Sequence, residues 1–154
     1  MQAAVRAIII NDDTLLVMHR NKFGTEYDTL IGGAVEMGES FEQAILREIQ
    51  EETGVQVQNP RPVFIDRAGE PYGTQYIFLC DYVSGEPVLS AAAPETTINA
   101  MGQNLYQPKW LPLAELANAP FKSEATKRAI LFGAEHGFPE ESVDITGKTT
   151  YTSW

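Results

Sequence analysis

The strongest constraint on the fold is one clearly delimited helix that lies between runs of aliphatic and β-branched residues. Ser40, with Gln43 three residues later, fits a capping box, and Gly54 supplies the left-handed residue that commonly ends a helix. These signals predict a helix over residues 41–53. The apolar face that would dock on a sheet comprises Phe41, Ile45 and Ile49.

Apolar runs before and after this helix predict strands. A polar turn at 11–13 separates the runs 3–10 and 14–20 and predicts a hairpin. Further strands are expected at 26–31, 55–66, 74–83 and 106–111, helical segments at 113–116 and 123–136, and a long loop at 84–104. This alternation, without internal repeats, predicts one mixed α/β domain over residues 1–154.

Composition narrows the classes of function. The chain has 154 residues, of which 44% are hydrophobic, and this is enough to form a hydrophobic core without disulfides or structural metals. Its net charge of −10 has the wrong sign for gripping a phosphate backbone, so we expect no nucleic-acid partner. No apolar run is long enough to cross a bilayer, so we expect no membrane partner. A single cysteine, Cys80, excludes an internal disulfide and favours a cytoplasmic location.

Acidic residues are concentrated in one stretch. Between Glu26 and Glu52 there are eight acids and one base, Arg47. On the predicted helix, Glu48 and Glu52 lie within about 40° of each other, and Glu51 lies roughly 60° from Glu48. Surface glutamates usually have a basic residue one turn away, whereas this stretch has only Arg47, which lies about 100° from the three glutamates on the helical wheel. The pattern indicates either a solvated acidic face or a site for hard cations such as Mg²⁺.

A longer motif surrounds these glutamates in residues 33–55. It consists of Gly33, five residues, Glu39, seven residues, and then Arg47, Glu48, Ile49, Glu51, Glu52, Gly54 and Val55 at fixed spacing. This segment resembles the Nudix box and meets every specified position, with a chance probability on the order of 10⁻⁷. The upstream hairpin and residues 104–116 also resemble that family. Ile31 is a departure, because family members often carry proline there.

The resemblance implies an α/β/α sandwich with a mixed sheet. It also implies a Mg²⁺-dependent pyrophosphohydrolase, with Mn²⁺ as a substitute ion, in which water attacks phosphorus in the diphosphate of a nucleoside diphosphate derivative. The metal ligands it implies are Gly32, through its carbonyl, and Glu48, Glu51 and Glu52, and these three glutamates are also the implied catalytic residues. Arg47 would pair with Glu39 or orient Glu48.

The sequence does not identify the general base that would activate the water. A glutamate of the box is the favoured candidate, and a residue downstream of the box is the alternative. Glu95, in the expected loop, is the best candidate outside the box, and Glu70 is a weaker one. For Glu95 an exposed loop acid is the more common role, because loops are ordinarily polar and solvated.

Candidate substrate contacts lie outside the box. Arg6 and Arg20 interrupt or end apolar runs and could bind phosphate oxygens, although arginines at strand ends are more often surface charges. Tyr27 and Tyr106 could stack on a base, whereas Trp110 is expected to pack in the core.

Two alternatives and several details stay open. An isopentenyl-diphosphate-isomerase-like enzyme would need a catalytic cysteine in the pocket, and Cys80 lies in an apolar run. A non-catalytic nucleotide sensor would usually show a degraded box. The sequence does not choose among nucleoside triphosphates, nucleotide sugars, ADP-ribose and dinucleoside polyphosphates, or between a monomer and a homodimer.

Overall fold

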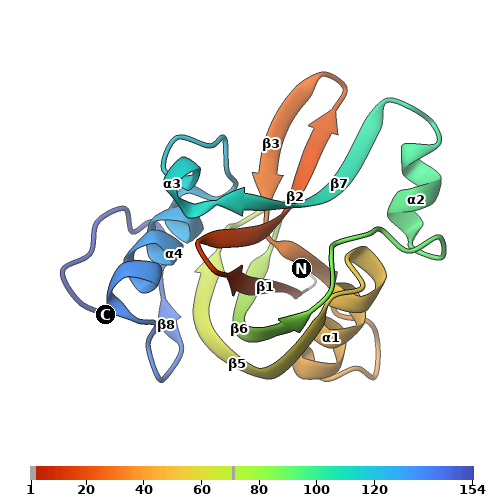
Figure 1. The fold of residues 1–154 in the computed structure, drawn as a ribbon. Coiled ribbons are helices and arrows are strands. Elements are labelled where there is room, and N and C mark those ends of the chain that lie inside the picture. The colour runs from red at the N-terminus through yellow and green to blue at the C-terminus, as the bar shows by residue number, and fades with distance from the viewer. Residues whose placement is uncertain (1–2, 71) are drawn as a thin grey trace.

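A mixed β-sheet runs through the centre of the protein, as Figure 1 shows. The computed structural model describes residues 3–70 and 72–154. The strands are β1 Ala4–Asn11, β2 Thr14–Lys22, β3 Thr25–Thr29, β4 Ile31–Ala34, β5 Gln56–Arg67, β6 Thr74–Ser84, β7 Asn104–Pro112 and β8 Val143–Asp144. The helices are α1 Phe41–Glu52, α2 Pro94–Asn99, α3 Leu113–Leu116 and α4 Glu124–His136. Within the described residues, no helix has the length and apolar character that a membrane span requires.

Most of the predicted elements are present, and three expectations need correction. The region 26–31 holds parts of two strands, because β3 pairs with β2 whereas β4 pairs with β1. The expected loop 84–104 contains α2, which begins at Pro94. Proline is well tolerated in the first turn of a helix, because the N–H groups there make no hydrogen bond within the helix. The tail, for which no element was expected, contributes β8, which pairs in parallel with β5.

Strand β1 organises the sheet. Along one edge it runs parallel to β6 from Ala4 to Ile10. Along the other edge it pairs first with β4 and then, only at Ile10 and Asn11, with β2. Because β2 leaves β1 so early, it is free to pair with both β3 and β7. These three strands lie above β1, β5 and β6 in Figure 1.

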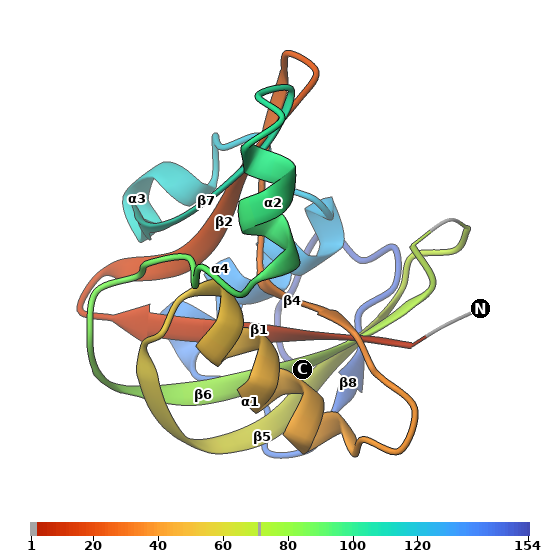
Figure 2. The same cartoon turned by 90° about the vertical axis from the view of Figure 1, so that its right-hand side faces the viewer.

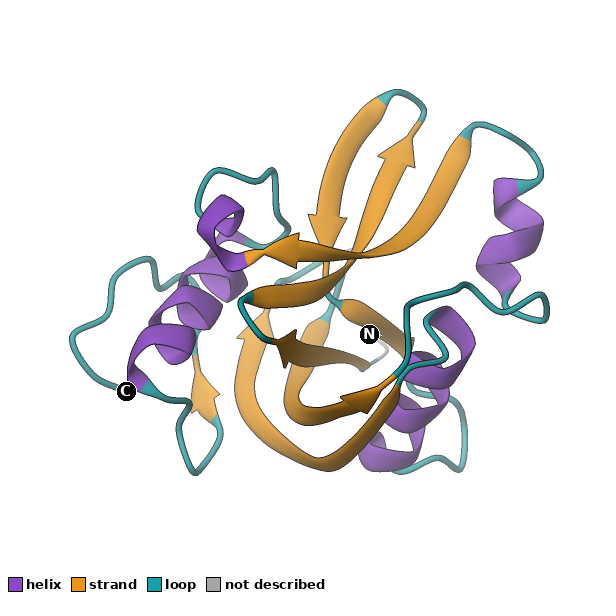
Figure 3. Cartoon of the chain, in the orientation of Figure 1, coloured by secondary structure: helices purple, strands orange, loops and turns teal. Residues whose placement is uncertain are grey.

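Alternate residues of β1 enter two separate apolar clusters, as the two-residue period of a strand requires. Ile8 belongs to a cluster that includes Ile130 of α4. Ile9 belongs to the other cluster, which includes Ile45 and Ile49 of α1. Figures 1 and 2 show α1 and α4 on opposite sides of the strands, and Figure 3 distinguishes the helices from the strands by colour. The expected α/β/α sandwich is confirmed.

The cluster against α4 gives a test of this packing. Ile130 is fully buried, so Ile130→Ala should lower the free energy of unfolding by about 2–5 kcal/mol, because it removes apolar contacts and leaves a cavity. The exposed Glu135→Ala on the same helix should change it by less than about 0.5 kcal/mol. Urea denaturation of both variants measures the difference. Equal destabilisation by the two changes would contradict the layer assignment.

Candidate active site

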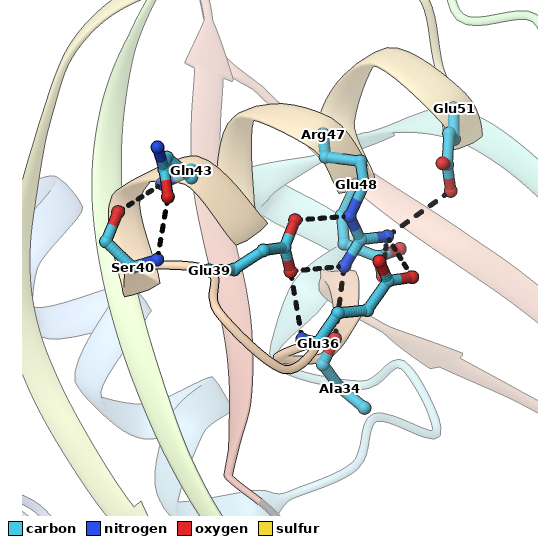
Figure 4. A network of polar contacts seen from close by, with 8 residues as sticks. All are labelled: Ala34, Glu36, Glu39, Ser40, Gln43, Arg47, Glu48 and Glu51. Carbon is cyan, nitrogen blue, oxygen red and sulfur yellow. Dashed lines mark hydrogen bonds and ion pairs between the residues drawn. The ribbon is translucent and has the colours of Figure 1, made fainter.

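Helix α1 is fixed at both ends by the signals that the sequence predicts. The side chain of Ser40 accepts a hydrogen bond from the backbone N–H of Gln43, and the backbone N–H of Ser40 donates to Gln43 Oε1, at 3.1 and 2.9 Å. Both bonds appear in Figure 4. Gly54 follows the helix with a φ of 68°, a conformation that glycine adopts without strain. The helix therefore presents its glutamates at defined positions.

Arg47 connects the glutamates of the motif (Figure 4). Its Nε and Nη2 donate to the two carboxylate oxygens of Glu39 at 2.7 and 2.9 Å, and Nη1 donates to Glu48 Oε1 at 2.9 Å. Weaker contacts reach Glu51 Oε2 at 3.5 Å and the carbonyl oxygen of Ala34 at 3.2 Å. Hydrogen bonding from Arg47 lowers the pKa of Glu39 to about 2. The sequence analysis gave pairing with Glu39 and orientation of Glu48 as alternatives for Arg47, and the structure shows both contacts.

Three carboxylates converge, as the sequence predicts, but one of the three is not the expected residue. Glu48, Glu52 and Glu95 each place an oxygen within 4.8 Å of the others. The side chain of Glu51 is 36% exposed, interacts with Arg47 and is not part of this group. We call Glu48, Glu52 and Glu95 the acid cluster.

Glu95 was expected to be an exposed acid in a loop, and this expectation is wrong. Glu95 lies in the first turn of α2, and its Oε2 is buried without a hydrogen-bond partner among residues 3–70 and 72–154. The segment before α2 is tied to the end of α1, because the backbone N–H of Ser90 donates to the carbonyl oxygen of Glu51 at 3.0 Å. Thr96 of α2 donates in turn to the carbonyl oxygen of Ser90. These two bonds bring Glu95 to α1.

Electrostatics make the acid cluster unfavourable without a cation. Burial, followed by the charges of Glu48 and Glu95, raises the pKa of Glu52 well above its usual value. Burial also raises the pKa of Glu48. The half-buried Arg6 compensates only partly, and its own pKa is lowered by desolvation despite the two glutamates. A set of carboxylate oxygens that includes one buried, unpartnered atom fits a hard divalent cation.

Two glycines permit this close packing. The backbone N–H of Gly32 donates to Glu52 Oε1 at 3.0 Å, and a Cβ at Gly32 would collide with the carbonyl oxygen of Val5. A Cβ at Gly33 would lie 2.7 Å from Glu48 Oε1. Side chains at these positions would push β4 away from β1 or displace Glu48. Ile31, the residue that departs from the family pattern, is fully buried beside α1.

A cavity of about 850 Å³ adjoins the acid cluster and contains most of the predicted substrate contacts. Arg6, Arg20, Tyr27 and Tyr106 all line it. The guanidinium of Arg20 lies 3.6 Å from the ring centroid of Tyr106 and 5.6 Å from that of Tyr27. Trp110 is not among the described lining residues and packs edge-on against Tyr82. Arg20 is thus held in place by ring faces at the cavity wall.

Sequence analysis did not identify several other lining residues. Lys122 places its Nζ 4.3 Å from the ring centroid of Tyr27, and Tyr72 extends the row at 5.9 Å from that nitrogen. On another side, the buried Asp66 accepts hydrogen bonds from Ser123 and Thr126. No motif marks these residues, because they come from separate segments that meet only in the folded chain.

Cys80 does not serve the cavity. It is 2% exposed in the apolar cluster against α1, and it is not among the described residues that line the cavity. Burial raises the pKa of its thiol to about 12. The structure therefore provides no pocket cysteine of the kind that an isomerase would require.

Comparison with known proteins agrees with this geometry. A family model described as the NUDIX domain matches residues 1–131. This chain belongs to the NUDIX family. The acid cluster and the glycine pair thus lie in a NUDIX domain, as the resemblance of residues 33–55 led us to expect.

Among curated proteins, this NUDIX chain is similar to the NAD-capped RNA hydrolase NudC of Shigella dysenteriae, with 34% identity over 105 residues, or 68% of this chain and 38% of the relative. NudC of Photobacterium profundum is 38% identical over 111 residues, covering 71% and 37% of the two chains. The chain therefore spans less than two fifths of the length of these relatives. An ADP-ribose pyrophosphatase from Streptococcus suis shares the fold, with a TM-score of 0.63, 21% identity and coverage of 93% and 96%.

Repulsion in the acid cluster predicts an unusual pH dependence of stability in metal-free protein. Because folding raises the pKa of Glu52, the folded state binds this proton more tightly than the unfolded chain, whose glutamate pKa is about 4.3. The free energy of unfolding should therefore fall as pH rises above about 4.3 towards the pKa of Glu52 in the folded protein. Glu52→Gln should flatten this dependence and melt at or above the wild-type temperature.

Thermal denaturation in EDTA between pH 4 and pH 8 measures both effects. The exposed Glu140→Gln is the matched control and should keep the wild-type slope. A Glu52→Gln variant with a melting temperature well below wild type across this range would contradict the account of the cluster.

Proposed function

We propose that this NUDIX chain is a divalent-metal-dependent hydrolase that cleaves the diphosphate linkage of a nucleoside diphosphate derivative. The observation that carries the proposal is the position of the acid cluster beside a cavity lined by arginine and tyrosine side chains. Carboxylates can hold the cation, arginines can hold phosphate oxygens, and rings can hold a base. A protein with a net charge of −10 needs such local positive groups to accept a polyanion.

The proposed ion is Mg²⁺, with Mn²⁺ as a substitute, because the donor atoms are carboxylate oxygens. Glu48 and Glu52 would hold it, with the carbonyl oxygen of Gly32 as a further ligand, and Glu95 lies beside them in the acid cluster. The expectation that Glu51 is also a ligand stays a prediction. When bound, such an ion stabilises charge on phosphate oxygens and lowers the pKa of a water molecule. Arg47 positions Glu48 through the hydrogen bond at 2.9 Å.

Cavity residues would orient the substrate. The Nε of Arg6 donates to Gln75 at 2.9 Å, which directs its guanidinium along the cavity wall, close to the acid cluster. Arg20, flanked by Tyr27 and Tyr106, is the second candidate for binding phosphate oxygens. A planar base would stack on the parts of these two rings that Arg20 and Lys122 do not cover. Attack on phosphorus needs a group that accepts the proton of the water, and the unpartnered Oε2 of Glu95 is the acceptor that we propose.

The nature of the substrate beyond the diphosphate is also a proposal. The curated relatives are named as hydrolases of NAD-capped RNA, so the expectation that this chain binds no nucleic acid stays a prediction, supported by the acidic net charge. Its expected cytoplasmic location and its organisation as one domain also stay predictions. A non-catalytic sensor is less favoured, because the acid cluster is complete and adjoins the cavity.

A substrate screen with Mg²⁺ tests the proposed function. The panel comprises a nucleoside triphosphate, ADP-ribose, a nucleotide sugar and a dinucleoside polyphosphate. At least one should be hydrolysed, at a rate that rises towards alkaline pH because deprotonation of the attacking water becomes easier. Excess EDTA should abolish turnover, and Glu52→Gln should lower kcat at least ~10³-fold, as the loss of a key electrostatic group does. Full activity in EDTA would refute the mechanism.

A second experiment separates the roles of Glu95 and Glu51. Glu95→Gln should lower kcat by at least ~10²-fold and leave KM nearly unchanged, because proton acceptance acts in the transition state. Glu51→Gln should have a smaller effect, because this side chain is partly exposed and lies outside the acid cluster. Single-turnover rates in saturating Mg²⁺ measure both. The reverse order of effects would assign the base to the box.

A further inference from the structure

The C-terminal tail, residues 143–154, contributes to the cavity although it lies beyond the residues that match the family. Thr146, Gly147 and Thr149 line the same cavity as Arg6 and Tyr27. The tail does more than cover the outer surface of the sheet and α4, because it reaches the cavity. The tail therefore supplies part of the cavity lining from outside the residues that the family model matches.

The start of the tail is joined to the sheet by main-chain bonds. Val143 and Asp144 pair in parallel with β5, and the backbone N–H of Ile145 donates to the carbonyl oxygen of Ile65 at 2.9 Å. The backbone N–H of Arg67 donates to Thr146 Oγ1 at 2.8 Å. Ile145 is fully buried, so the turn that follows it is held at the cavity rim.

Aromatic contacts hold the end of the tail. The ring of Trp154 lies 5.0 Å, centroid to centroid, from both Phe64 of β5 and Phe132 of α4. Its Nε1 donates to the carbonyl oxygen of Gly137 at 2.8 Å. Tyr151 packs against Phe132 at 5.5 Å. With both ends fixed, residues 146–149 have a defined position.

Part of the cavity lining differs chemically from the group formed by Arg20, Tyr27 and Tyr106. Besides Thr146 and Thr149, it carries the buried carboxylate of Asp66 with the hydroxyls of Ser123 and Thr126. We call these five residues the hydroxyl wall. A carboxylate only accepts hydrogen bonds, whereas hydroxyls both donate and accept, and this combination complements the hydroxyl groups of a sugar. The Arg20–Tyr27–Tyr106 group suits a base and phosphates instead.

We propose that the hydroxyl wall receives the group linked to the nucleoside diphosphate and that the tail selects a sugar at this position. The inference rests on the proposed hydrolase function and deepens it. It predicts a preference for ADP-ribose and nucleotide sugars, whose linked group carries several hydroxyls, over nucleoside triphosphates, whose linked group is a phosphate. Specificity would arise because the carboxylate of Asp66 can accept hydrogen bonds from sugar hydroxyls, whereas it repels a phosphate group.

Substitution of adjacent threonines tests the inference. Thr149 lines the cavity whereas Thr150 is not among its described lining residues, and both side chains are exposed, so neither change should impair folding. Thr149→Trp should lower kcat/KM for ADP-ribose and UDP-glucose at least ~10-fold, mainly by raising KM, and should change the value for ATP less than ~3-fold. Thr150→Trp should leave all three values within ~3-fold of wild type. The melting temperatures of Thr149→Trp and Thr150→Trp show whether both variants fold. If Thr149→Trp melts at a lower temperature than Thr150→Trp, the smaller change Thr149→Leu is used in its place.

The outcomes separate the two proposals. If the wild-type protein hydrolyses neither these three substrates nor the dinucleoside polyphosphate of the screening panel, the proposed function fails, and the inference fails with it. If it hydrolyses ATP but neither sugar-linked substrate, the hydrolase function stands and the sugar assignment is overturned. Equal losses on all three substrates in Thr149→Trp, or no difference from Thr150→Trp, would also overturn the selective role of the tail.

Discussion

Mutual repulsion among Glu48, Glu52 and Glu95 is the constraint on which the rest of the site depends. One oxygen of each lies within 4.8 Å of the others, and Glu48 and Glu52 are buried whereas Glu95 is half-buried. In such surroundings, like charges cost more than they do on a surface, and burial of an ionised carboxylate adds to that cost. A fold that retains this arrangement is suited to bind a cation, which converts the repulsion into attraction.

The remainder of the framework keeps these carboxylates in place when the cation is absent. Arg47 holds Glu48 from one side, and Arg6 contributes positive charge from the cavity. The N–H of Gly32 stabilises one oxygen of Glu52. Each of these groups favours the ionised carboxylates, and together they only partly offset burial, since the pKa of Glu52 stays raised. Glu52 therefore binds a proton more readily than an exposed glutamate, and a cation would compete with that proton.

The cavity adds a second level of organisation through the variety of its lining. Arg20 lies close to two aromatic rings, and the lining also contains Asp66 with several hydroxyls. Glu52 and Glu95 of the acid cluster line the same cavity. Under the proposed function, this variety would give the base and the linked group of a substrate different partners.

Local geometry explains why so much of the site followed from sequence. The capping box, the ends of α1, the Arg47–Glu39 pair and the proximity of Glu48 to Glu52 all depend on spacings of a few residues, which a helix converts directly into positions in space. Tertiary structure decided the rest. Glu95 replaced Glu51 in the acid cluster because hydrogen bonds tie the segment before α2 to the end of α1. Lys122, Asp66 and the tail reached the cavity only through packing between segments far apart in the chain. Such contacts depend on closing long loops against a completed core, and no local spacing encodes that closure.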